Sequence, residues 1–288
     1  MFPADGILIP HHRQYLPVSY NAIQHPTMSI TLRRIQKYKK AKKTLEDLYD
    51  NPNHVLIIHY SCESFYDIKE GRTPRITSIA VRYLRSAQTK SFSIHKVAEI
   101  KNLTLAEIEN HYDTLEKQML TEYFDFLKEH KDFKWVHWNM RDINYGFEAL
   151  ENRFIVLGGQ PFQLNDDNKI DIARVLIEKY GVQYIGHPRL TKLLEKNDIS
   201  AKNLLNGDEE AKAFDNKEYV KLHQSTLRKV DVIDSILKRS VESDLKTNAT
   251  IRQIYGLTPQ GIYELIKDHW LWSLIISIIM LFLGWLLS

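Results

Sequence analysis

The chain has 288 residues, 39 Lys and Arg against 36 Asp and Glu, and a single cysteine, Cys62. A net charge of +3 is too small to indicate nucleic-acid binding from overall charge, and one cysteine excludes an internal disulfide framework. The opening residues lack a basic segment followed by an apolar one, so no secretory signal peptide is predicted.

Residues 1–27 are rich in Pro and His without a steady period, which indicates an irregular arm. A helix is predicted from Ser29 to Tyr49, and Pro52 prevents its continuation. The segment 33–43 of this helix holds seven basic residues and no acidic one. These side chains either meet phosphates or anionic lipid headgroups, or form a solvated helix face. The candidate nucleic-acid ligands are the basic residues in its first part: Arg33, Arg34, Lys37, Lys39 and Lys40.

The next stretch has the pattern of an antiparallel meander, with β-like runs at 54–65, 75–84 and 90–100 separated by short polar breaks. Apolar residues three and four apart then predict a long helix over 103–131, with Thr104 and Glu107 as its capping box. A short strand (134–140), a helix (145–156) and a segment that begins as a strand and continues as a helix (169–180) follow. This order predicts an α/β domain with a mixed sheet.

Further helices are predicted over 190–196, over 216–241 and from Gln260 onward. Residues 270–288 contain no charge, and Trp270, Trp272 and Trp285 lie near the two ends of this segment. Because Lys267 precedes it, the segment predicts a single membrane-spanning helix, with the N-terminal domain cytoplasmic. A buried core helix is the alternative. The predicted divisions are an arm with a basic helix (1–53), an α/β domain (54–245), a juxtamembrane linker and helix (246–269) and the transmembrane helix (270–288).

Three local motifs carry candidate chemistry. The first strand reads IIHYSCESF, and its period of two places Ser61 and Glu63 on the same face. The segment WVHWNMRDINYGF places Asn139 three residues before Asp142, at a predicted strand-to-helix turn. On a late helix, YVKLHQSTLRKVD places His223 five residues before Arg228.

With the order of the elements, these motifs resemble the DEDD exonucleases, the proofreading (DnaQ-like) branch of the ribonuclease H-like fold. The resemblance covers roughly residues 55–241 and implies a ribonuclease H-like mixed sheet flanked by helices, followed here by the transmembrane helix. It also implies two Mg²⁺ or Mn²⁺ ions held by four carboxylates, with a His or Tyr that positions the attacking water. On this basis Glu63, Asp142 and His223 retain catalytic positions, and Glu63 and Asp142 remain as metal ligands.

Ser61 and Arg228 replace the other two carboxylates. Hard divalent cations need anionic oxygen ligands, and Arg228 adds a positive charge, so metal-dependent catalysis is expected to be impaired. The guanidinium instead pairs with Glu63 or Asp142, or holds a phosphate. Outside the family, Glu63 is a strand carboxylate paired with a nearby Arg, Asp142 a turn residue or helix N-cap, and His223 a histidine on a helix surface.

The sequence therefore predicts a membrane-tethered, exonuclease-like domain that binds a nucleic-acid end, a nucleotide or a protein partner, as in a defence or signalling system. One alternative is an active metal-dependent 3′-to-5′ exonuclease, in which Asp67 or Asp171 completes the metal site. Another is a membrane assembly or scaffold protein. Arg72 and Arg75, which flank the second strand, and Asn139 are further candidate nucleic-acid contacts.

Overall fold

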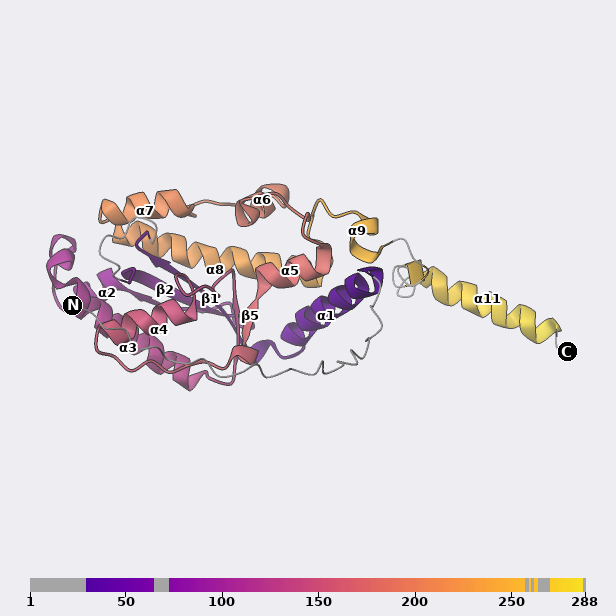
Figure 1. The fold of residues 1–288 in the computed structure, drawn as a ribbon, viewed down its shortest axis with the longest axis horizontal. Helices are drawn as coiled ribbons and strands as arrows, with labels where there is room; N and C mark the ends of the chain where they lie inside the picture. The colour runs from indigo at the N-terminus through magenta and orange to yellow at the C-terminus, as the bar shows by residue number, and fades with distance from the viewer. Residues whose placement is uncertain (1–29, 65–72, 257–258, 260–261, 264–269, 287–288) are drawn as a thin grey trace, which may run out of the picture.

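The computed structural model describes residues 30–64, 73–256, 259, 262–263 and 270–286. Over these ranges the chain is a mixed α/β fold built on a five-stranded sheet of order β3-β2-β1-β4-β5 (Figure 1). As predicted, the first three strands are antiparallel, whereas β4 and β5 run parallel to β1. The strands are β1 (Val55–Cys62), β2 (Ile76–Tyr83), β3 (Thr89–Ser93), β4 (Lys134–His137) and β5 (Lys169–Asp171).

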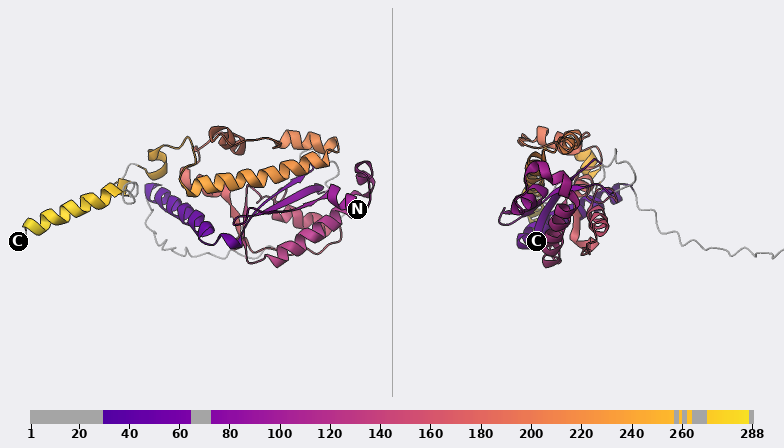
Figure 2. Two further views of the ribbon diagram at one scale, coloured as in Figure 1. Left: turned by 180° about the vertical axis from the view of Figure 1, so that it is seen from behind. Right: turned by 90° about the vertical axis from the view of Figure 1, so that its left-hand side faces the viewer.

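Helices cover both faces of this sheet (Figure 2). The α-helices described are α1 (Ile30–Asp50), α2 (Ile94–Ile100), α3 (Tyr112–Glu129), α4 (Phe147–Val156), α5 (Ile172–Tyr180), α6 (Arg189–Lys196), α7 (Gly207–Asp215), α8 (Tyr219–Val241), α9 (Ile251–Tyr255) and α11 (Trp270–Leu286). Short 3₁₀ helices are η1 (Pro52–His54), η3 (Leu105–His111) and η4 (Asp166–Asn168).

The alternation of side chains along β1 builds two apolar cores. Leu56 and Ile58 pack on one face with α2, α3 and α4, and Val55 and Ile57 pack on the other with α1, α5 and α8. A strand covered on both faces reads as a nearly continuous apolar run, which explains its sequence. Toward its end β1 carries the buried polar residues His59 and Ser61.

Two predicted elements each divide into two in the structure. The predicted strand over 90–100 divides, because Ile94, Val97 and Ala98 recur at helical spacing and are buried in α2. The predicted helix over 103–131 begins as η3 before it continues as α3. Its capping pair is present, since Thr104 N donates to Glu107 Oε2 at 2.8 Å.

α7 is absent from the prediction. The sequence pattern that could have predicted this helix is Asn206 followed three residues later by Glu209, which is a capping box. In the structure Glu209 N donates to Asn206 Oδ1, and Asn206 N donates to Glu209 Oε2.

The prediction of a membrane-spanning helix over 270–288, and of a fold class that ends in one, is wrong. α11 has 17 residues. Within the described ranges, no helix is both long enough and apolar enough to cross a bilayer. Location at a membrane, which was inferred from this segment, stays a prediction.

Candidate functional site

The residues predicted at the end of β1 have structural partners. Ser61 is buried in β1 opposite Ser78 of β2. Glu63 follows the strand, and its Oε2 accepts from Arg75 N at 3.3 Å and lies 3.5 Å from Arg75 Nε. Glu63 therefore has the contact expected of it outside the exonuclease family, a pairing with a nearby arginine.

Arg75 is held inside the fold. Its guanidinium donates to Glu109 Oε1 at 2.7 Å and lies over the rings of Tyr112 and Phe214, 4.5 and 4.9 Å from their centres. These contacts occupy the group that an incoming phosphate would need. Arg72 and Asp67, the other candidates in this region, lie outside the described residues.

Asp142 and Asn139 lie in the loop between β4 and α4. Asp142 is exposed and its Oδ1 accepts from Asn144 N at 2.8 Å, which makes it a turn residue. Asn139 has a left-handed backbone with φ of 56°, which Asn tolerates better than most residues, and its N–H donates to Asp171 Oδ1 at 3.1 Å. The loop thus brings Asp142 near Asp171, and both side chains line one cavity.

The two predicted residues of α8 have other neighbours. His223 is buried and faces His95 of α2, with ring centres 5.0 Å apart. Arg228 Nε donates to Ser200 O at 3.2 Å. Among the described residues, no three His, Cys, Asp or Glu side chains lie close enough to hold a metal ion, so Glu63, Asp142 and His223 are not gathered into one centre.

Lys229, beside Arg228, is a buried cation that sequence reasoning missed. Its Nζ lies 2.7 Å from Glu210 Oε2 of α7, and the two side chains are 9% and 15% exposed. Ser225 Oγ donates to Glu210 Oε1 at 3.2 Å. Burial, and then the Lys229 charge, hold the pKa of His59 well below its ordinary value. An ammonium group therefore lies near the polar end of β1.

The burial of Lys229 could have been predicted from its position in the apolar stripe of α8. Leu222, Thr226, Val230 and Ile233 recur at spacings of three and four and are fully buried. Lys229 lies three residues after Thr226 on this stripe, whereas Arg228 lies off it.

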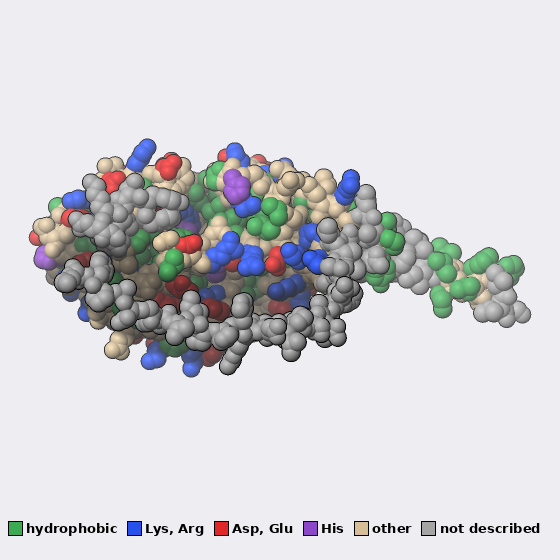
Figure 3. All heavy atoms as spheres, in the orientation of Figure 1, with side chains coloured by type: hydrophobic (Ala, Val, Ile, Leu, Met, Phe, Trp, Pro, Cys, Tyr) green, Lys and Arg blue, Asp and Glu red, His purple; other side chains and the backbone are tan. Residues whose placement is uncertain are grey.

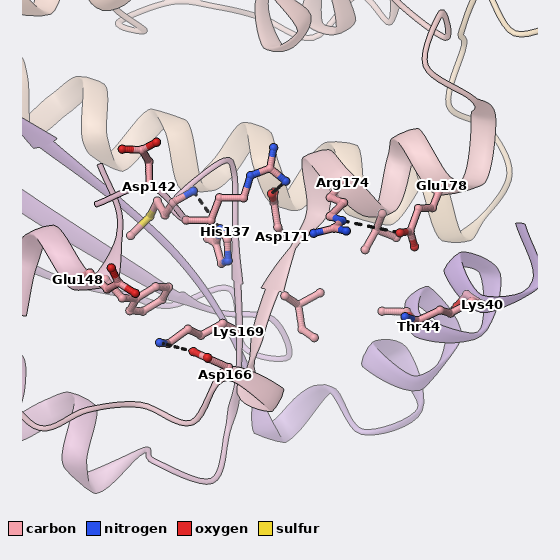
Figure 4. A pocket seen from close by; sticks show the side chains of 15 residues that line it. Lys40, Thr44, His137, Asp142, Glu148, Asp166, Lys169, Asp171, Arg174 and Glu178 are labelled. Atoms are coloured by element: carbon pink, nitrogen blue, oxygen red, sulfur yellow. Dashed lines mark hydrogen bonds and ion pairs between the residues drawn. The ribbon is translucent and has the colours of Figure 1, made fainter. Parts of the chain in front are cut away.

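A cavity of about 580 Å³ opens at the carboxyl ends of β4 and β5, beside α1, α4 and α5 (Figure 4). Basic and acidic side chains are intermixed on the face of the molecule in Figure 3. The charged side chains that line the cavity are Lys40, Arg141, Lys169 and Arg174, with Asp142, Glu148, Asp166, Asp171 and Glu178. Carboxyl ends of parallel strands are the edge at which α/β sheets bind ligands.

His137 and Asp171 stand where β4 and β5 end. His137 Nδ1 accepts from Met140 N at 3.1 Å, and burial, opposed by the Asp171 charge, lowers the pKa of His137 to about 4. The ring is therefore neutral at pH 7 with its proton on Nε2, which leaves a donor at the cavity. Asp171 caps α5 by accepting from Ala173 N, and its Oδ2 lies 2.9 Å from Arg141 Nη1.

The basic residues of α1 have different roles: Arg34 contacts other helices, and Lys40 lines the cavity. Arg34 donates to the carbonyl oxygens of Glu178 and Gln253 at 2.6 and 2.9 Å, which fastens α1 to α5 and α9. Lys40 lines the cavity, and Arg33, Lys37 and Lys39 are exposed. Of the five candidates on this helix, Lys40 is the one that reaches the cavity lining.

The cavity combines a neutral imidazole donor with four cationic and five acidic side chains, which suits a ligand that carries both an anionic group and hydrogen-bond donors. Comparison of the chain with protein-family models, curated proteins and solved structures gave no match.

Proposed function

We propose that the chain is an exonuclease-like domain with impaired catalysis, whose cavity at the ends of β4 and β5 binds a nucleotide or the terminal nucleotide of a nucleic acid. The observation that carries this proposal is the cavity itself, with His137 at its wall and Lys40, Arg141, Lys169 and Arg174 around it. Guanidinium, ammonium and imidazole groups are donors for phosphate oxygens. The order of elements, with three antiparallel strands before two parallel ones, supports the exonuclease resemblance.

The charge balance favours a nucleotide over inorganic phosphate. Three cations of the cavity already face carboxylates: Arg141 lies 2.9 Å from Asp171, Lys169 2.7 Å from Asp166 and Arg174 3.7 Å from Glu178. A bare phosphate would have to compete with these carboxylates. A ligand that brings hydroxyl or amino donors as well as phosphate satisfies both kinds of group.

One end of the cavity is acidic, and at the other end Glu178 lies beside Lys40 and Arg174 (Figure 4). Asp142 and Glu148 lie at one end, and Lys40 and Arg174 lie toward the other (Figure 4). Sugar hydroxyls or base amino groups can donate to the two carboxylates while a phosphate accepts from the two cations. The volume of about 580 Å³ falls within the range of small-molecule sites.

Impaired catalysis is supported by the end of β1. The Lys229 ammonium is close enough to lower the pKa of His59, and Glu63 is paired with Arg75. A divalent cation needs anionic oxygen ligands, and the Glu63 carboxylate is already paired with Arg75.

Binding can be tested by titrating a nucleoside monophosphate and a labelled single-stranded oligonucleotide into the full chain and the double variant Lys40→Ala/Arg174→Ala. We expect at least tenfold weaker binding in the variant, which is about 1.4 kcal/mol. Both side chains are exposed, so the fold is expected to tolerate the change. Lys192→Ala is the matched control, because Lys192 is exposed on α6 and pairs with Glu195. Equal affinity in the double variant, or no binding to the unaltered chain, would contradict the proposal.

Catalysis is tested with an end-labelled single strand in the presence of Mg²⁺ or Mn²⁺. We expect no release of nucleotides above the level of a heat-inactivated sample. Metal-dependent release of nucleotides that Asp142→Asn or Glu63→Gln abolishes would identify an active exonuclease and contradict the proposal that catalysis is impaired. The binding result stands apart from this one, because the cavity variants retain both residues.

A further inference from the structure

A second cavity, of about 400 Å³, lies where α1, α5 and α9 meet. Ile177, Tyr180 and Val182 give it apolar walls, and the Val182 side chain is left 67% exposed there. An apolar side chain that is open to solvent inside a cavity is available to a ligand. Charged and amide side chains also line this cavity: Arg34, Lys37, Glu178, Gln183 and Gln253.

This second cavity adjoins the cavity of the proposed function. Glu178 lines both, and each is lined by residues of α1 and of α5. In Figure 4, Glu178 and Lys40 lie at the end of the first cavity that is farther from Asp142. The Glu178 carboxylate faces Arg174 at 3.7 Å, so its charge is compensated. The two cavities are therefore neighbouring parts of one groove along the contact between α1 and α5.

Two lysines of α1 follow this groove. Lys37 lines the second cavity and Lys40 lines the first. Residues three apart share a face of a helix, and these two are separated by roughly 4.5 Å along the helix axis. Within the described ranges neither forms an ion pair, whereas Lys42 lies 3.9 Å from Glu46. The row offers one uncompensated ammonium group to each cavity, which is where a phosphate between two nucleotides would bind.

The lining of the second cavity suits a nucleobase. A base has apolar faces and a polar edge, so it needs apolar walls such as Ile177 and Val182 together with amides that bind its edge. Gln253 Nε2 donates to Gln183 Oε1 at 3.3 Å, which leaves the Gln183 amide nitrogen as a donor. Arg34 forms wall rather than ligand contact, because its guanidinium already donates to carbonyl oxygens of α5 and α9.

We infer that the second cavity is the subsite for the next nucleotide of a single strand whose terminal nucleotide occupies the first cavity. The phosphate between the two nucleotides lies beside Lys37 and Lys40, and the second base contacts Ile177 and Val182. The inference rests on the proposed function and adds the length and course of the ligand. That course follows α1, which precedes the region of the exonuclease resemblance.

The test titrates adenosine monophosphate and the dinucleotide pApA into the full chain in a calorimeter. We expect pApA to bind at least tenfold more tightly, which is about 1.4 kcal/mol, because it fills both cavities. In the double variant Lys37→Ala/Val182→Asp this advantage is expected to disappear while the affinity for adenosine monophosphate is retained. Both side chains are exposed and neither lines the first cavity, so the change leaves that cavity intact.

The matched control is Lys43→Ala/Val156→Asp, which makes the same change in charge. Lys43 is exposed on the same helix, Val156 is 63% exposed on α4, and neither lines either cavity. We expect the control to keep the tighter binding of pApA. Loss of the advantage in the control as well, or its survival in Lys37→Ala/Val182→Asp, would overturn the inference.

The dependence of affinity on salt gives a second readout. Each phosphate that a single strand places against a cation steepens the fall of log K with log salt concentration by about 0.7. Lys37→Ala is expected to reduce the slope for pApA by about this amount and to leave the slope for adenosine monophosphate unchanged. An unaltered slope for pApA would contradict the contact with Lys37.

Failure of this inference differs from failure of the proposed function. If adenosine monophosphate binds and pApA binds no more tightly, the first cavity is a nucleotide site and the second subsite is wrong. If neither ligand binds, both proposals are wrong.

Discussion

At the scale of single residues, the buried pair of Lys229 and Glu210 carries the first prediction. Lys229→Ala leaves the Glu210 carboxylate buried without its cation, so we predict a loss of about 2 to 4 kcal/mol in the free energy of unfolding. Lys221→Ala, on the same helix, removes an exposed pair with Glu218 and is expected to cost less than about 1 kcal/mol. Urea denaturation measures both, and equal losses would show that Lys229 is not desolvated as described.

His137 makes a second residue-scale prediction, for the dependence of stability on pH. Its folded pKa of about 4 lies below the ordinary value of 6.5. Between these two pH values His137 is protonated in the unfolded chain and neutral in the folded chain. The contribution of the neutral His137 ring to the free energy of unfolding is therefore complete above pH 6.5 and is lost as the pH falls toward 4. Replacing His137 with Asn, which keeps an acceptor for Met140 N, should reduce the stability lost between pH 7 and 4 by about 2 to 3 kcal/mol.

Denaturant titrations at each pH check this expectation, with His111→Asn as the control because His111 is exposed. The same loss in His137→Asn as in the unaltered chain would mean that His137 accepts a proton in the folded state.

Local residue chemistry was predictable where the partner was near in sequence or set by the turn. The pairing of Glu63 with an arginine and the turn role of Asp142 were both among the readings that the sequence allowed. Lys229 was not predicted, because its partner Glu210 lies on α7, a helix that the periodicity did not reveal. The meeting of His137 with Asp171 depends on the pairing of β4 with β5, which no local pattern encodes.

At the scale of elements, Arg34 joins three helices and carries its own prediction. It donates to carbonyl oxygens of α5 and α9 from α1, and hydrogen bonds from charged donors are worth about 1.5 to 3 kcal/mol each when buried. Because this guanidinium is partly exposed, we expect Arg34→Ala to lose about 1 to 3 kcal/mol in total, and α9 amides to exchange hydrogen faster. Arg33→Ala is the matched control, since Arg33 is exposed on the same helix. Hydrogen exchange in α9 that is unaffected by Arg34→Ala would contradict the role of Arg34 in joining α1 to α9.

Periodicity predicted most elements, and it failed where two patterns overlap. β-like runs between short polar breaks identified β1 and β2, and spacings of three and four identified α3. The sequence over 90–100 has a strand pattern at its start and helical spacing at Ile94, Val97 and Ala98. The boundary between β3 and α2 is set by the packing of α2 against α3 and α8.

At the scale of the whole molecule, the sheet has two polar regions at different positions. The parallel pair β4 and β5 ends at an open cavity with mixed charge, and the antiparallel strands β1, β2 and β3 carry buried polar residues against α8. The mixed α/β class was predictable from the order of elements. The position of the cavity was not, because it depends on α1 packing beside α5 at the far edge of the sheet.

The most direct test of the central claim is a crystal structure of the chain with a nucleoside monophosphate, grown with magnesium present. The account predicts density for the nucleotide in the cavity, with its phosphate toward Lys40 and Arg174, its sugar or base toward Asp142 and Glu148, and no metal ion on Glu63. A nucleotide bound instead at the end of β1, with magnesium coordinated by Glu63, would contradict it.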